Sequence, residues 1–309
     1  MWRLQRVQDS DAVFFQSMAD RGHYRSKGQT RQGIYVCSPS GKLLSSINSL
    51  DPDKVLESIR GGLKKWESLT PVERTLVSGE EIEPNHRWED NYPVGGLVLT
   101  SVNTDLPSDP PRTEERTGLW NLDHVWFSKT EARRWLSADP QEGEIYPLPE
   151  DLANRLFRFH LVDNVRGQTL PFAPQEIKDS KISIQVEERQ KSIVRMSITG
   201  TSRAVAHGEW LLGKNDWTPN YPLNHGMTSK ILGTATYDLN SDSFTKFEMV
   251  AIGERFGKTE NNSRRSAPDS SHVGFLFTLS GGGPSERIAP AFVDIYGADW
   301  IVSPVSETL

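Results

Sequence analysis

The spacing of apolar residues changes along the chain, from a helical period in the first half to a period of two beyond about residue 160. The clearest helical period is a set at the spacing of one helix face: Val55, Leu56, Ile59, Leu63 and Trp66. Asp51 precedes Pro52, which is the pattern of a helix N-cap followed by proline in the first turn. We therefore predict a helix over residues 52–68.

A β-hairpin is predicted directly before this helix. Residues 33–37 and 42–47 are rich in β-prone side chains, and the turn between them is Ser38-Pro39-Ser40-Gly41. The turn, the second strand and the capped helix weakly resemble the C-terminal half of a thioredoxin-like fold over about residues 30–68. The resemblance implies a small α/β module at residues 1–70. Because the chain has no Cys-x-x-Cys, thiol redox activity is not expected.

The segment 71–120 is rich in proline and acidic residues, and only 94–102 has a strand-like pattern. We predict an irregular connection between two domains here. A capping box starting at Ser128 predicts a helix over residues 129–137. Acidic residues followed by spaced apolar ones predict a second helix over residues 150–159.

Beyond residue 160, apolar and polar residues alternate in several segments that are separated by polar turns. The alternating apolar positions include Ile182, Ile184, Val186, Val194, Met196, Ile198, Val273, Phe275 and Phe277. They predict antiparallel strands that form a curved sheet or an open barrel over residues 121–309. The expected fold class is α+β, with this β-rich domain following the smaller module.

Composition narrows the functional classes. The 309 residues carry a net charge of −6 with scattered lysines and arginines, which argues against a nucleic-acid partner. No apolar run is long enough to span a membrane, and the N-terminus does not have the pattern of a secretion signal. The single cysteine, Cys37, fits either the cytoplasm or a mature exported chain without its signal. The start of the chain also leaves open a missing upstream segment.

One polar cluster stands out near the end of the helix predicted over 150–159. His160, Asp163 and Arg166 fall within seven residues, and they are the candidate catalytic group. Histidine and aspartate would exchange a proton, and arginine would hold a carboxylate or phosphate. The alternative is structural: histidine and arginine are favoured at a helix C-terminus, and Asp163 would pair with an arginine.

Aromatic and polar residues on loops form the second candidate set. The loop before one central hairpin and the segment after it should meet at one sheet edge, which brings Tyr221, His225 and Arg255 together. Trp126 and Trp217 are further candidates for stacking on a ligand. The alternative is that these rings anchor irregular loops to the sheet. The seven histidines are widely spaced, so neither a metal nor another cofactor can be assigned.

These patterns favour a ligand-binding or protein-interaction protein with a pocket in its β-rich domain. One alternative is an enzyme whose acid–base site, with or without a metal, is assembled from loops. Another is a structural subunit of an oligomer. The expected partners are a small molecule or another protein, and the sequence does not decide whether the chain is an enzyme.

Overall fold

The computed structural model describes residues 10–23, 31–76, 91–107, 119–208, 223–259, 261–264 and 269–291. Within these ranges, residues 10–76 form one compact unit and residues 91–291 form another. The predicted α+β class is confirmed, because a large antiparallel sheet and a small one occur together with separate helices. None of the described helices is both long and apolar enough to cross a membrane.

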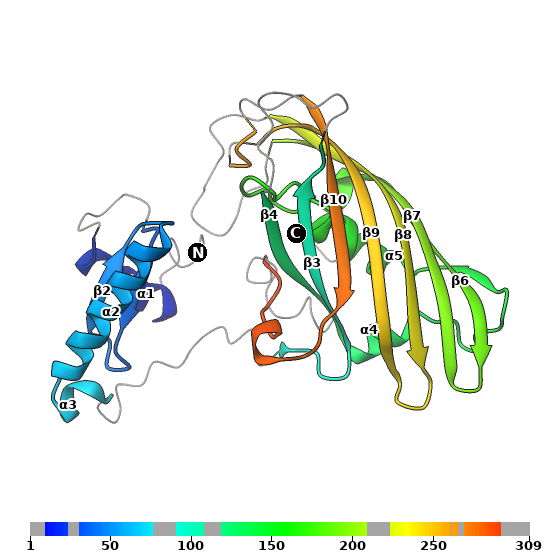
Figure 1. The fold of residues 1–309 in the computed structure, drawn as a ribbon. Coiled ribbons are helices and arrows are strands. Elements are labelled where there is room, and N and C mark those ends of the chain that lie inside the picture. The colour runs from blue at the N-terminus through cyan, green and yellow to red at the C-terminus, as the bar shows by residue number, and fades with distance from the viewer. Residues whose placement is uncertain are drawn as a thin grey trace. The chain divides into compact units, whose positions relative to one another are not determined.

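The smaller unit is a β-hairpin with a helix on each face (Figure 1). Its elements are α1 (Ser10–Arg21), β1 (Ile34–Cys37), β2 (Leu43–Ile47), α2 (Pro52–Ser68) and α3 (Pro71–Arg74). The predicted hairpin and the predicted helix over 52–68 are both present. Gly41 allows the tight turn because its φ of +75° lies in the left-handed region.

The larger unit is built on one sheet of eight antiparallel strands (Figure 1). The strands are β3 (Leu97–Asp105), β4 (Trp120–Phe127), β5 (Ile145–Pro147), β6 (Ile177–Gln190), β7 (Ile193–His207), β8 (Asn224–Asp238), β9 (Ser243–Gly257) and β10 (Ser270–Leu279). Their order is β4-β3-β10-β9-β8-β7-β6-β5, so β4 and β5 are the edges and the sheet does not close into a barrel.

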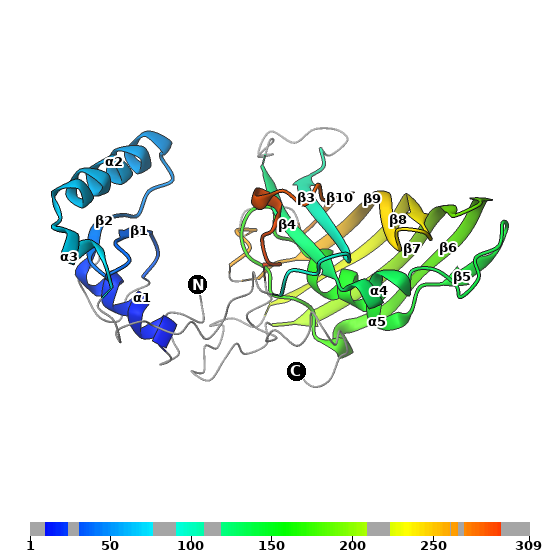
Figure 2. The same ribbon diagram turned by 90° about the horizontal axis from the view of Figure 1, so that it is seen from below.

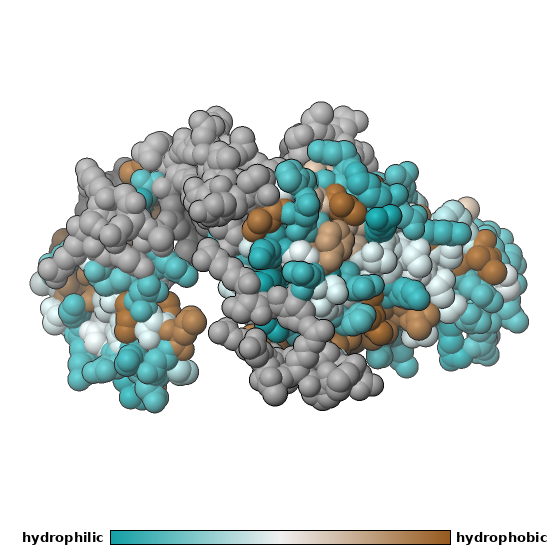
Figure 3. Space-filling model, turned by 90° about the horizontal axis from the view of Figure 1, so that it is seen from above, coloured by the Kyte–Doolittle hydropathy of each residue, from teal (hydrophilic) through white to brown (hydrophobic). Residues whose placement is uncertain are grey.

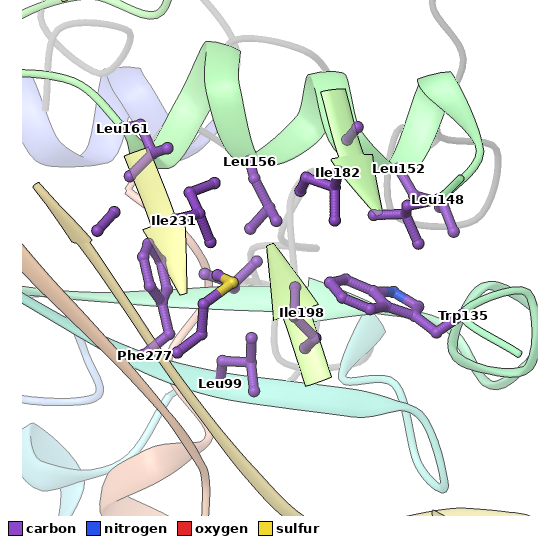
Figure 4. Packing of buried hydrophobic residues seen from close by; sticks show 14 of the residues in the cluster. Leu99, Trp135, Leu148, Leu152, Leu156, Leu161, Ile182, Ile198, Ile231 and Phe277 are labelled. Carbon is purple, nitrogen blue, oxygen red and sulfur yellow. The ribbon is translucent and has the colours of Figure 1, made fainter. Parts of the chain in front are cut away.

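Short helices cover the inner face of this sheet (Figure 2). They are α4 (Lys129–Arg133), α5 (Glu150–Arg155) and a π-helical turn, η2 (Leu156–His160), with the 3₁₀ turns η3 (Pro174–Glu176) and η4 (Pro284–Glu286) elsewhere in the unit. Leu152 and Leu156 point from the helical layer toward Ile198 and Ile231 on the strands (Figure 4). Packing of these two layers forms the main hydrophobic core.

The sheet begins earlier in the chain than predicted. We expected an irregular connection over residues 71–120 and a β-rich domain from 121, but β3 is an internal strand and β4 begins at Trp120. Both strands direct polar side chains inward, including Asn103 and Asp123. The strand-like segment 94–102 overlaps β3, but the inward polar residues interrupt the apolar alternation that marks the other strands, so the sequence pattern did not assign either strand to the sheet.

The two helices predicted in the larger unit are shorter than expected. The helix over 129–137 is α-helical only as far as Arg133. The helix over 150–159 is α-helical to Arg155 and then widens into the π-helical turn that ends at His160. Such turns are frequent near functional sites, and this one places His160 against the inner face of the sheet.

The coloured part of the face in Figure 3 is mostly hydrophilic with smaller hydrophobic patches. On the outer side of the large sheet, Leu232, Val250 and Leu276 lie next to each other on three adjacent strands and are exposed. The inward-facing residues of the same three strands belong to the hydrophobic core. Along β8 to β10 the inward-facing residues are consistently buried, whereas the outward-facing residues include apolar as well as polar side chains.

Candidate functional site

The inner face of the large sheet becomes polar at one end, the upper end of the strands in Figure 1. β3 and β9 end here, and β8 and β10 begin here, so the connections 106–119, 208–223 and 258–269 all join strands at this end. The opposite end has the short turns 191–192 and 239–242. Loops at one end of a rigid sheet are a frequent location for binding residues.

A buried arginine joins two aspartates at this end. Arg264 donates from Nε and Nη2 to Asp163 at 2.8 and 2.5 Å, and from Nη1 and Nη2 to Asp105 at 3.0 and 2.7 Å. The Arg264 side chain is only 1% exposed. Because each carboxylate is held by two parallel contacts, the orientation of the guanidinium group is well defined.

Two further arginines extend the cluster. Arg166 donates from Nε to Asp105 Oδ2 at 2.6 Å, and Arg255 Nε lies 3.5 Å from Asp163 Oδ2. Arg255 also donates to the carbonyl oxygens of Gly257 and Asp269. Three guanidinium groups against two carboxylates give the cluster a net charge of +1. We call these five residues, Asp105, Asp163, Arg166, Arg255 and Arg264, the arginine cluster.

Hydrogen bonds between two loop segments, and within one of them, hold the cluster in place. Gln168 N donates to Asn261 O at 3.0 Å, and Gly167 lies so close that a Cβ atom there would be 2.2 Å from the same oxygen. Thr169 Oγ1 donates to Asp163 O at 2.6 Å. Only glycine permits this approach of the two segments, which carry Asp163 and Arg264 respectively.

The charges reinforce one another electrostatically. Burial tends to raise the pKa of Asp105, but hydrogen bonds from Arg264 and Arg166 outweigh it and hold the pKa below its usual value. Burial likewise tends to lower the pKa of Arg264, and its bonds to Asp163 and Asp105 raise the pKa above the ordinary value. The pKa of Arg255 is lowered, chiefly by burial. An ionised Asp105 and a charged Arg264 are therefore the expected states at neutral pH.

His225 lies beside the cluster on the same inner face. It is paired with Gly257 in the β8–β9 register, two residues from Arg255 on the neighbouring strand, so the structure brings these two predicted ligand residues close together. Its ring stacks on Phe172 with centroids 5.7 Å apart. Burial lowers the pKa of His225, although the Leu223 carbonyl and Asp163 oppose this shift. A neutral ring is expected at pH 7.

The three residues of the predicted catalytic group separate into two arrangements. Asp163 and Arg166 belong to the arginine cluster, where Arg264 and Asp105 link them. His160 instead bonds through Nδ1 to Asp123 Oδ2 at 3.2 Å. Asp123 Oδ1 also accepts a hydrogen bond from Ala291 N. The expected proton exchange would therefore involve Asp123 rather than Asp163.

Of the predicted aromatic ligands, Trp126 is among the described residues and lies away from the arginine cluster. Trp126 is fully buried on the outer side of β4, where it meets Tyr92 edge to face with centroids 5.5 Å apart. This contact matches the alternative in which a ring anchors a loop, and it does not bring Trp126 to the arginine cluster. Tyr221 and Trp217 lie outside the described residues.

Three central residues of the site were not singled out from the sequence: Asp105, Asp123 and Arg264. Asp105 lies just beyond the segment 94–102 that looked strand-like, Asp123 lies on a strand that the apolar pattern did not reveal, and Arg264 is in a polar loop between β9 and β10. Asp105 is the last residue of its strand and directly precedes a proline-rich segment. This position at a strand end was the one sequence signal that could have marked it as a site residue. The distance along the chain from Asp105 to Arg264 left no local pattern that links them.

No group of three or more metal-ligating side chains is present within the described ranges. Comparison with known proteins finds no protein-family model that matches the chain and no significant match among curated proteins. The functional argument therefore depends on the geometry of the site.

Proposed function

We propose that the β-rich unit is a ligand-binding domain and that its arginine cluster binds a small anionic ligand through a carboxylate or phosphate group. The main observation behind this proposal is the hydrogen bonding of the Arg166 guanidinium group. Within the described residues, its Nε is held by Asp105 while its two terminal nitrogens have no hydrogen-bond partner. A guanidinium edge oriented in this way matches the planar, bidentate recognition of such anions.

The surroundings of Arg166 support the same proposal. The cluster carries one excess positive charge, and the Arg166 side chain is 12% exposed, so it is close to solvent while Arg255 and Arg264 are enclosed. Buried ion networks contribute little net stability compared with apolar packing, and buried charged groups cluster at functional sites, which favours a functional role for this network. His225 would supply a neutral hydrogen-bonding group beside the anion.

The proposal is tested by thermal unfolding in phosphate or acetate at constant ionic strength, with chloride as the reference salt. At ten times the dissociation constant, a bound anion should raise the Tm by about 3–6 °C. Arg166→Gln should lose this response. Arg195→Gln is the matched control, because Arg195 is 59% exposed on β7 and should leave the response intact. An Arg166→Gln variant that responds like the unaltered chain contradicts the proposal.

His160 supports a second candidate, an acid–base site on the same inner face. Its Nε2 is buried without a hydrogen-bond partner among the described residues, while Nδ1 is oriented by Asp123. That geometry leaves Nε2 as the atom that would exchange a proton with a substrate. Nitrogen-15 NMR of the histidine rings tests it: an Nε2 resonance that does not respond to phosphate or acetate argues against this role.

A further inference from the structure

The helix α2 carries a row of apolar side chains that does not pack on its own unit. Leu56, Ile59 and Leu63 are 43%, 36% and 53% exposed, and exposed Pro52 continues the row toward the N-terminus of the helix. Their spacing of three and four residues places them on one face. We call these four residues the α2 stripe.

The contact with the hairpin uses a different face of the helix. A Cβ atom at Gly62 would lie 3.0 Å from the side chains of both Val36 and Ser45, so the helix approaches the hairpin most closely there. Ser45 Oγ also donates to Ser58 O at 2.8 Å. At 100° per residue, Gly62 and Ser58 are roughly a quarter turn or more from the α2 stripe. The hairpin therefore leaves the stripe uncovered.

Charged residues border the stripe on the side away from the hairpin. Asp53 and Arg60 are exposed, opposite in charge and seven residues apart, so they project in nearly the same direction from α2. Two antiparallel helices bring such flanking positions of the two copies together. This pattern permits attraction between two copies of the same helix.

We propose that the α2 stripe binds the α2 stripe of a second copy of this chain, with the two helices antiparallel. The stripe is symmetric about its own midpoint, with Leu56 and Ile59 in the middle and Pro52 and Leu63 at the ends. A two-fold axis at that midpoint places Leu56 against Ile59 of the second copy. It also brings Asp53 within two residues, about 3 Å of helix rise, of Arg60 of the second copy, and this happens twice per dimer.

The charges select this register over the next one. Moving the two-fold axis one step, to the midpoint between Ile59 and Leu63, would instead bring Arg60 within two residues of helix rise of Arg60 of the second copy. Like charges at this position oppose association, whereas the first register pairs both arginines with aspartates. Because each copy contributes a single helix face, the covered area is below the roughly 1,600 Å² of a standard interface. A reversible dimer is the expected state.

The test is sedimentation equilibrium of the full chain over a range of concentrations. The unaltered chain should show a monomer–dimer equilibrium, and Leu63→Ser should abolish the dimer. Arg60→Asp should weaken it by about tenfold or more, since two attractive pairs become repulsive. The double variant Asp53→Arg/Arg60→Asp restores both pairs in reverse and should recover the dimer.

Controls separate this interface from a loss of folding. Lys54→Asp reverses a charge just as Arg60→Asp does, but at a different position on α2. The Lys54 side chain is 66% exposed, and this variant should leave the dimer unchanged. Circular dichroism should give equal helix content in every variant. An unaltered chain that stays monomeric at all concentrations overturns the proposal. A double variant that dimerises no more tightly than Arg60→Asp alone also overturns it. These outcomes are independent of anion binding by the larger unit.

Discussion

At the scale of single residues, the arginine cluster depends on mutual compensation of buried charges. Arg264 and Arg255 are each 1% exposed, and both are tied to Asp163. A buried charge that loses its counterion retains its desolvation cost, so the loss of one partner is more harmful than the net value of the pair suggests. Asp163 is consequently more important for stability than an exposed aspartate of the same unit.

Asp163→Asn should lower the free energy of unfolding by about 3 kcal/mol, because it removes the carboxylate partner of buried Arg255 and leaves buried Arg264 with Asp105 alone. Urea denaturation of the variant measures this change. Asp179→Asn, at an exposed position of β6, is the isosteric control and should change stability by less than about 0.5 kcal/mol. Equal effects of the two substitutions would show that Asp163 does not balance the arginines.

A pH dependence follows from the buried histidines. Burial lowers the pKa of both His225 and His124 in the folded chain, so the unfolded chain binds more protons just below the ordinary pKa of about 6.5. Stability should therefore decrease as the pH falls through this value. His225→Gln should reduce that decrease, whereas His207→Gln, at an exposed position, should not. Urea titrations at pH 7.5 and 5.5 measure the difference, and identical pH slopes would contradict it.

At the scale of elements, the alternation along each strand determines which substitutions matter. Ile231 and Leu232 are adjacent on β8, yet Ile231 is 2% exposed in the core and Leu232 is 63% exposed on the outer face. Both are large aliphatic residues, so composition alone does not distinguish them. The same reasoning applies to α2, where Gly62 rather than the apolar row makes the closest contact with the hairpin.

Ile231→Ala should cost about 3 kcal/mol of unfolding free energy, since it removes buried methyl groups and leaves a cavity. Leu232→Ala should cost less than about 0.5 kcal/mol. Chemical denaturation of the two variants under identical conditions makes this comparison. Similar losses at both positions would mean that the outer side of β8 is covered in solution.

At the scale of the whole molecule, the two units differ in how much apolar material they bury. The buried apolar residues described in the smaller unit are Ala12, Met18, Ala19 and Leu44, whereas the larger unit has a continuous core from seven strands and the helical layer. Local stability generally follows the density of buried apolar contacts. The smaller unit should therefore open more readily than the larger one.

Hydrogen exchange followed by mass spectrometry should detect this difference. Backbone amides of β1 and β2 should exchange faster than those of β7, β8 and β9, because their opening exposes far less buried surface. If the α2 dimer forms, protection of α2 should increase with protein concentration. Equal protection of the hairpin and the central strands of the large sheet would contradict the difference in stability.

The sequence by itself determined the elements whose signals are local. The helix over 52–68, the hairpin before it and the long antiparallel strands follow from capping residues, turn residues and alternation, which act within a few positions. The segment 94–102 gave a strand-like signal for β3, but β4 and the place of both strands in the sheet escaped this reasoning because the polar residues Asn103 and Asp123 face the interior.

Only the tertiary structure decided which distant residues meet. Asp105 and Arg264 lie 159 positions apart in the chain, and His160 bonds to Asp123 rather than to nearby Asp163. Such pairings depend on strand order and register, which arise from the packing of the whole sheet and leave no periodic trace in a single sequence. The polar residues were visible from the start, but their partners were set by the fold.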